Sequence, residues 1–482
     1  MTSALVRLWP FYRAFATRKL AALGPKYLPF ADVASPDMPL SRLLRLSLFQ
    51  VTVGMALVLL VGTLNRVMIV ELSVPASLVA VMLALPLLFA PFRTLIGFKS
   101  DVHVSALGLR RVPYIWKGTL LQFGGFAIMP FALLVLSGYG EAVDAPRWIG
   151  YGSAALSFLL VGAGVHMVQT VGLALATDLV PQDDQPKVVG LMYVMLLVGM
   201  VASALVFGAL LENYTPGRLL QVIQGAAVVT AVLNLAEMWK QEPRSRARAK
   251  AMKAAPHVAF TDAWTSMMES PGILRLLIVI ALGTFGFGMA DVLLEPYGGQ
   301  ALGLSVASTT KLTALLATGT LIGFGIASRG LAHGGAPNHY ALMGAVIGIP
   351  GFMAIILSSQ GAGLPLFLGG TLATGLGAGL FGHATLTGVI RSAPPDRIGL
   401  ALGAWGAVQA TAAGIGVALA GITRDVILGW QGQTGASMQL PYAVVFMIEV
   451  VFLILAIAVL LPAVKQRVKS RHGQDIYARA ER

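Results

Sequence analysis

The sequence has 482 residues, of which 56% are apolar and only 11% charged, and its mean hydropathy is +0.78. Soluble proteins carry about 25% charged residues, so an ordinary water-soluble enzyme is excluded. The 34 lysines and arginines exceed the 21 acids and give a net charge of +13. In a membrane protein, such an excess indicates which side of the bilayer holds the loops. The sequence has no cysteine, which excludes disulfides and thiolate metal sites.

Residues 1–42 precede the first long apolar stretch and combine basic with aromatic and leucine residues. This composition is typical of a short amphipathic helix on an anionic membrane surface. A helix packed beneath the protein's own bundle would have the same composition. Both interpretations of this segment stay open.

Twelve apolar stretches follow, each long enough to cross a bilayer as a helix. They predict an all-α polytopic fold with a six-helix bundle at 43–239, a basic linker at 240–272, a second six-helix bundle at 273–464 and a tail at 465–482. The predicted helices are 43–70, 75–96, 113–137, 150–177, 188–211, 218–239, 273–295, 305–328, 340–358, 362–391, 396–421 and 441–464.

The distribution of charge predicts the orientation. Residues 1–45 carry seven basic and two acidic groups, residues 240–271 carry six and three, and residues 465–482 carry six and two. Because basic segments stay on the cytoplasmic side, both chain termini are predicted to be cytoplasmic.

Two halves of six helices joined by a linker form the layout of the major facilitator superfamily, and an internal repeat supports this fold. The stretches GAGVHMVQTVGLALATDLVP from Gly162 and GAGLFGHATLTGVIRSAPP from Gly377 both belong to the fourth predicted helix of their half. GFKSD, from Gly97 to Asp101, and the following GLRR, ending in Arg110 and Arg111, resemble the superfamily's short cytoplasmic loop motif.

Charged side chains inside membrane helices are costly, which makes them functional candidates. Arg66 and Glu71 end the first predicted helix, while Asp291 and Glu295 occupy the matching part of the seventh. Asp291 and Glu295 are one turn apart and share a helix face. They are candidates for a proton relay. The alternative is a salt bridge from Arg66 to Asp291 or Glu295 that latches the two halves together.

Two histidines, His166 and His383, lie within predicted membrane helices beside glycines. Small residues let a neighbouring helix approach closely. They also leave a flat space for a macrocycle, whose metal a neutral imidazole binds axially. Gln169 and Thr170 are near His166 and are candidates for fixing its tautomer. Pigment ligation and hydrogen bonding across helices both stay open. No other metal site and no hydrolase or nucleotide motif is present, so we expect no enzyme activity.

Several segments closely resemble the PucC and LhaA family of photosynthetic bacteria. They include PFRTLIGFKSD (Pro91 to Asp101), LGLRRVPYIWKGTLLQFGGFAIMPFAL (Leu107 to Leu133) and GVHMVQTVGLALATD (Gly164 to Asp178). Members are major facilitator relatives regarded as bacteriochlorophyll delivery proteins for light-harvesting antenna assembly. The extended basic amino terminus resembles the LhaA branch, which serves LH1, more than the PucC type, which serves LH2.

The resemblance implies an assembly factor that delivers bacteriochlorophyll to antenna polypeptides in the bacterial intracytoplasmic (inner) membrane, with carotenoid as a second candidate pigment. Implied partners are antenna polypeptides, reaction-centre assembly intermediates, the pigment-synthesis and membrane-insertion machinery and anionic lipid, but no nucleic acid. The resemblance favours His166 as the pigment ligand. Such a protein needs an apolar cavity open to lipid, with the glycine-rich helices at 362–421 as candidate walls. The alternative function is proton-coupled transport of an amphipathic or porphyrin-like solute through Asp291 and Glu295.

Overall fold

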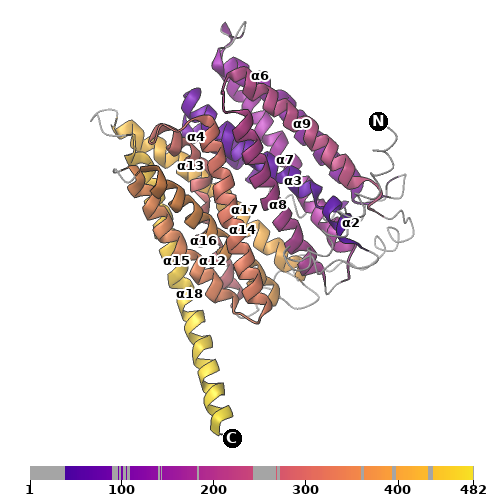
Figure 1. Cartoon of the computed structure of the whole chain (residues 1–482), viewed down its shortest axis with the longest axis vertical. Helices are drawn as coiled ribbons and strands as arrows, with labels where there is room; N and C mark the ends of the chain where they lie inside the picture. Colours follow the sequence, from indigo (N-terminus) through magenta and orange to yellow (C-terminus); the bar gives the residue numbers. More distant parts are fainter. Residues whose placement is uncertain are drawn as a thin grey trace, which may run out of the picture.

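The computed structural model describes residues 38–88, 109–138, 144–181, 184–242, 272–359, 363–392, 398–431 and 438–480, with a few positions between them. These ranges form one bundle of helices and contain no strand (Figure 1). The amino-terminal segment before residue 38 and most of the central linker lie outside the described residues. Gly97 and Asp101 of the predicted loop motif do so as well.

The first half comprises α2 (Leu40–Leu46), α3 (Leu48–Leu57), η2 (Val58–Leu64), η3 (Val67–Glu71), α4 (Ala76–Leu88), α6 (Val112–Ser137), α7 (Arg147–Asp178), α8 (Gln185–Leu210) and α9 (Pro216–Met238). The second half comprises α12 (Ile273–Gly288), α13 (Ala290–Gln300), α14 (Val306–Ala332), α15 (Pro337–Leu357), α16 (Gly363–Ser392), α17 (Ile398–Gln431) and α18 (Leu440–Ala480).

The described chain contains 11 helices that are long and apolar enough to span a membrane, and α4 is a shorter apolar helix. This confirms the predicted all-helical, multi-pass fold. Two helices extend ten residues or more beyond their predicted ends. The α17 helix continues to Gln431, and α18 continues through the predicted tail to Ala480, beyond the bundle (Figure 1). The tail has no proline after Pro462, and apart from Gly473 it is rich in strong helix formers, which allows the last helix to continue.

The two halves meet through three sets of helices. The α4 helix packs against α17, α8 and η2 pack against α14, and η2 and η3 of the first membrane helix pack against α13. At Gly421 on α17, an added Cβ would lie 2.6 Å from the carbonyl oxygen of Ala76. Only glycine allows the two backbones to approach so closely at this point.

The first membrane helix of each half is irregular where the halves meet. Residues Val58–Leu64 and Val67–Glu71 are π-helical, and Met289 separates α12 from α13. π-helices are rare in proteins, but those that occur often lie at functional sites. Their wider turn disturbs the regular hydrogen-bond ladder. The irregular segments therefore mark the contact between η2 and α13 as a candidate site.

The glycines of α16 bring it into backbone contact with two neighbouring helices. An added Cβ at Gly375 or Gly379 would lie 2.2 or 2.1 Å from carbonyl oxygens of α14, and one at Gly377 would lie 2.6 Å from the carbonyl oxygen of Gly344 on α15. Small residues serve such close packing. These three glycines therefore do not line an open cavity, in contrast to the prediction for the glycine-rich region.

Candidate functional site

Arg66 lies between η2 and η3, where the first membrane helix contacts α13 of the second half, at the end of the bundle that holds the connection from η3 to α4. We call this end the far end. The Arg66 side chain is 3% exposed and forms an ion pair with Glu71 of the same helix. Its Nη2 donates to the carbonyl oxygen of Leu304 in the second half, at 3.0 Å. The predicted salt bridge to Asp291 or Glu295 is not formed. The guanidinium group instead pairs with Glu71, and its hydrogen bond to Leu304 connects the two halves.

Glu295 points from α13 towards η2. The residue is 2% exposed, and its Oε1 accepts a hydrogen bond from the hydroxyl of Thr313. An added Cβ at Gly62 would lie 2.5 Å from this oxygen, so the glycine makes room for the carboxyl group. Its Oε2 has no hydrogen-bond partner within the described part of the chain. Glu295 is therefore a buried acid at the boundary of the two halves.

Asp291 lies one turn before Glu295, but its environment is different. Asp291 is exposed, whereas Glu295 is buried. Between them on the same helix, the carbonyl oxygen of Val292 accepts a hydrogen bond from Nδ2 of Asn65, at 2.7 Å. The sequence correctly grouped the first and seventh membrane helices. It did not indicate that the two acids face unlike surroundings.

Glu449 on α18 is completely buried and lies at the break between α12 and α13. Its Oε1 accepts a hydrogen bond from the backbone N–H of Ala290, the first residue of α13, at 2.5 Å. The first N–H groups of a helix have no partner within the helix and favour a negative group. Glu449 therefore caps α13 from another helix. The sequence did not predict this contact.

A second carboxylate caps a helix at the far end. Oδ2 of Asp425 on α17 accepts a hydrogen bond from the backbone N–H of Ser77 near the start of α4, at 2.7 Å. Arg424 pairs with Asp425 and donates to Oε1 of Gln300, which also accepts from the hydroxyl of Tyr442 at 2.5 Å. The contact between Asp425 and Ser77 joins the two halves, whereas Arg424, Gln300 and Tyr442 connect helices of the second half, and the sequence predicted none of these contacts.

The arginines of the predicted loop motif lie at the opposite end of the first half. Arg110 and Arg111 both form ion pairs with Asp178 at the end of α7. The carboxylate of Glu242 accepts hydrogen bonds from the backbone N–H groups of Arg110, Arg111 and Val112, at 2.7 to 3.0 Å. Glu242 thereby caps α6. The motif arginines hold helix ends together, with acids that the motif itself did not identify.

His166 lies on α7 and is partly buried, as are Gln169 and Thr170. Nε2 of Gln169 donates to Oε1 of Gln50 on α3, at 3.4 Å. Neighbouring helices occupy the space beside the two glycines that precede His166. An added Cβ at Gly162 would lie 2.3 Å from Pro86, and one at Gly164 would lie 2.5 Å from the carbonyl oxygen of Gly118. These glycines therefore serve helix packing and leave no flat space on their side of the helix.

His383 on α16 is 9% exposed, and its ring centroid is 4.0 Å from that of Phe324 on α14. Phe324 packs with Val194 and Leu197 of α8, so His383 lies beside the contact between the halves. At the adjacent Gly382, an added Cβ would meet no atom within 4 Å. Of the two intramembrane histidines, His383 is the one with free space at a neighbouring glycine.

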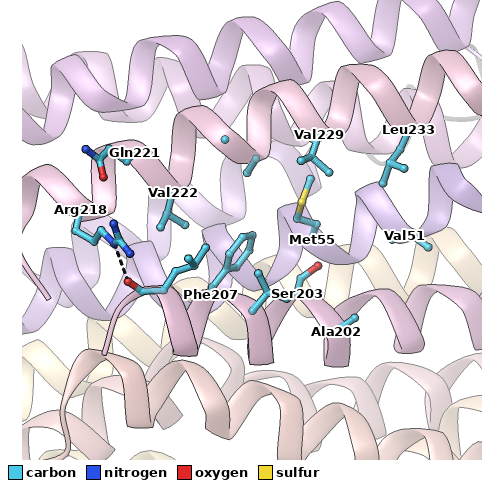
Figure 2. A pocket seen from close by; sticks show the side chains of 14 residues that line it. Val51, Met55, Ala202, Ser203, Phe207, Arg218, Gln221, Val222, Val229 and Leu233 are labelled. Carbon is cyan, nitrogen blue, oxygen red and sulfur yellow. Dashed lines mark hydrogen bonds between the residues drawn. The ribbon is translucent and has the colours of Figure 1, made fainter. Parts of the chain in front are cut away.

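The described structure also contains a lateral groove in the first half, between α3, α8 and α9 (Figure 2). Its volume is about 420 Å³, and most of its lining is aliphatic. Figure 2 shows Arg218 and Gln221 at one end of the groove, while Val51 and Leu233 lie at the other. The structure thus provides an apolar cavity that opens sideways, but within one half rather than between the halves.

Known proteins resemble this chain over nearly its whole length. Residues 63–468 match the family described as PUCC protein. Protein PucC of Rhodobacter capsulatus is 70% identical over 94% of this chain and 99% of its own length. An uncharacterized protein in the puhA-bchM intergenic region of the same organism is 48% identical over 93% of this chain and 94% of its own length.

A solved structure shows the same fold. It is a bacterial homologue of the human lysosomal transporter Spinster, in an inward-facing and unoccupied conformation, with a TM-score of 0.65. The two sequences are 16% identical, and the match covers 89% of this chain and 97% of the other. This likeness confirms the major facilitator fold. Taken with the family match and the identity to protein PucC, it shows that the chain is a member of the PUCC family.

Proposed function

We propose that this protein is an assembly factor for a photosynthetic antenna complex, which binds bacteriochlorophyll and passes it to antenna polypeptides within the membrane. The observation that carries the proposal is family membership across residues 63–468. The fold alone does not select a function, because transporters share it. In this proposal the protein binds and delivers but does not catalyse, and it lies in the bacterial inner membrane with both termini in the cytoplasm.

The surroundings of His383 fit a magnesium macrocycle better than those of His166. His383 is adjacent to the open space at Gly382, and the ring of Phe324 offers an aromatic surface. The glycines before His166 are filled by neighbouring helices. A bound bacteriochlorophyll would supply a magnesium ion with an axial position, which an imidazole nitrogen can occupy. His383 would hold the pigment there, while Gln169 and Thr170 would shape the surroundings of His166. Carotenoid binding is part of the proposal without an assigned residue.

The proposed client is LH2. Identity to a protein named PucC is 70%, whereas identity to the puhA-bchM intergenic protein of the same organism is 48%. By the family resemblance, the PucC type serves LH2, so the identities favour LH2 over the LH1 client that the amino terminus suggested. The proposed partners are antenna polypeptides, reaction-centre assembly intermediates, the pigment-synthesis and insertion machinery, and anionic lipid.

The test is the absorption spectrum of the protein purified in mild detergent from a pigmented host. We expect bacteriochlorophyll to elute with the wild-type protein and to be largely lost from His383→Ala. The exposed His333 provides the control variant His333→Ala, which should retain the pigment. His166→Ala should retain more pigment than His383→Ala. A colourless wild-type protein from a preparation with intact antenna complexes would contradict pigment binding.

Proton-coupled transport of an amphipathic or porphyrin-like solute is the second candidate, because Glu295 is a buried acid between the halves. A membrane acid at such a boundary suits a proton pathway. In vesicles, a transporter should show uptake driven by a pH gradient, and Glu295→Gln and Asp291→Asn should abolish it. An assembly factor should show no such uptake, and Glu295→Gln should leave antenna assembly intact.

A further inference from the structure

The lateral groove exists because two helices of the first half diverge. Both α8 and α9 pack against α3, but they scarcely contact each other. Val51 and Met55 of α3 form the floor, and the walls include Phe207 of α8 and Val229 of α9 (Figure 2). Val206 and Val229 are 54% and 44% exposed, so the groove opens on the outer surface of the bundle. In a membrane, this surface faces lipid.

Apart from the hydroxyl of Ser203 on α8, the polar side chains that line the groove lie at one end. Arg218 and Gln221 lie there, near the start of α9 (Figure 2). Nε of Arg218 donates to the carbonyl oxygen of Leu210, at 3.0 Å, which fixes the position of the guanidinium group. The group is exposed, and its terminal amino groups have no partner among the residues described. They remain available to an anionic ligand.

The depth of Arg218 in the membrane follows from the length of its helix. The 23 residues of α9 span about 34 Å at 1.5 Å per residue. The hydrocarbon core is about 30 Å thick, so Arg218, the third residue, lies at the level of the lipid headgroups. From Arg218 to Leu233 the helix runs about 22 Å. That exceeds half the core thickness, the depth of one leaflet.

We propose that the lateral groove binds an anionic phospholipid, with one acyl chain along the aliphatic walls and the phosphate at Arg218. A ligand with one polar end and one long apolar part matches the distribution of lining residues. Arginine is suited to phosphate because its planar fork can donate two parallel hydrogen bonds. The site is separate from His383 and from the acids of α13.

Gly225 offers a direct way to fill the groove. It lines the groove, and an added Cβ there would meet no atom within 4 Å. Gly225→Leu should therefore occupy the space of the acyl chain without displacing a neighbour. Gly124 on α6 has equally open space and does not line the groove, so Gly124→Leu is the matched control. Arg218→Gln removes the charge while leaving the walls intact.

The experiment is native mass spectrometry of protein from an unpigmented host, exchanged into equimolar phosphatidylglycerol and phosphatidylcholine with identical acyl chains. We expect the wild-type protein and Gly124→Leu to retain phosphatidylglycerol about tenfold more than phosphatidylcholine, or about 1.4 kcal/mol, because both lipids carry a phosphate but the choline ammonium cancels its charge beside Arg218. Arg218→Gln should lose the preference, and Gly225→Leu should lose the retained lipid.

Two results would overturn the proposal. One is equal retention of the two lipids by the wild-type protein, and the other is equal retention of phosphatidylglycerol by Gly225→Leu and Gly124→Leu. A third measurement uses protein from a pigmented host. If Gly225→Leu loses pigment but keeps phosphatidylglycerol, the groove holds the pigment and the phospholipid proposal is wrong.

Discussion

Asp425 on α17 accepts a hydrogen bond from the backbone N–H of Ser77 on α4, although the two residues are 348 positions apart. The carboxylate thus caps a helix of the other half. A helix N-terminus carries a partial positive charge, which favours this arrangement. Arg424 and the Gly421–Ala76 contact lie on the same helix pair, so the far end is held by charge and by close backbone packing together.

Asp425→Ala should destabilise the protein strongly. It removes the cap of α4 and also leaves Arg424, which is 4% exposed, without its ion-pair partner. Loss of one partner of a buried pair costs about 3 kcal/mol. Unfolding in detergent, followed by circular dichroism, would measure this change. Glu212→Ala, at an exposed acid beside α8, is the control. Equal stability of the two variants would show that the cap contributes nothing.

The pair of Arg66 and Glu71 can be tested by exchanging the charges. Arg66→Glu alone should reduce the yield of folded protein, because it places two acids side by side near the buried end of the first helix. Adding Glu71→Arg should restore much of the yield, measured by size-exclusion chromatography. Adding Asp291→Arg instead should not. Rescue by Asp291→Arg would favour the latch that the sequence suggested.

Glu449 should act mainly through its hydrogen bond to α13. Glu449→Gln keeps an oxygen acceptor for the N–H of Ala290, whereas Glu449→Leu leaves the end of the helix without a cap. We expect Glu449→Leu to lower the free energy of unfolding by about 1 to 2 kcal/mol more than Glu449→Gln, the usual value of an N-cap. Thermal unfolding of both variants in the same detergent gives this difference. Equal losses in the two variants would indicate that the charge, which both variants lack, is required rather than the hydrogen bond.

The glycines of α16 should differ sharply in their tolerance of larger residues. Gly379→Ala would place its Cβ 2.1 Å from the carbonyl oxygen of Thr320, so α14 and α16 must separate. Gly382→Ala meets no atom within 4 Å, and alanine favours a helix over glycine by about 1 kcal/mol. We expect the first variant to lower the melting temperature and the second to leave it unchanged or raise it. Similar losses in both would contradict the packing described.

The fold could be predicted because its signals are local. Apolar length indicated the spans, and the halves and the internal repeat indicated the pairing of helices. The end of α18 was missed because a charged sequence can continue a helix beyond the membrane when nothing terminates it. Helix ends depend on single residues, whereas the membrane spans depend on averages over about 20 residues.

The candidate site could be predicted only in part, because each charged side chain pairs with a group that is near in space, and the spacing along the sequence does not show which group that is. The sequence grouped Arg66 with the acids of α13, but Glu71 lies closer to its guanidinium. It did not single out Asp178, which pairs with Arg110 and Arg111. In the sequence, the glycines beside His166 and those beside His383 gave the same signal. Only the neighbouring helices show that the space at Gly382 is open and that at Gly164 is filled.

The backbone contacts of α16 also restrict how the second half can move. Where carbonyl groups face glycines, no side chain can rotate to absorb sliding, so α14, α15 and α16 should shift as one rigid body. If the two halves separate, the backbone must then bend in other segments. The break at Met289 and the π-helical part of the first helix are the natural hinges, because their hydrogen-bond ladders are already interrupted. The protein thus combines a rigid unit of three helices, α14, α15 and α16, with two irregular segments at which we expect it to bend.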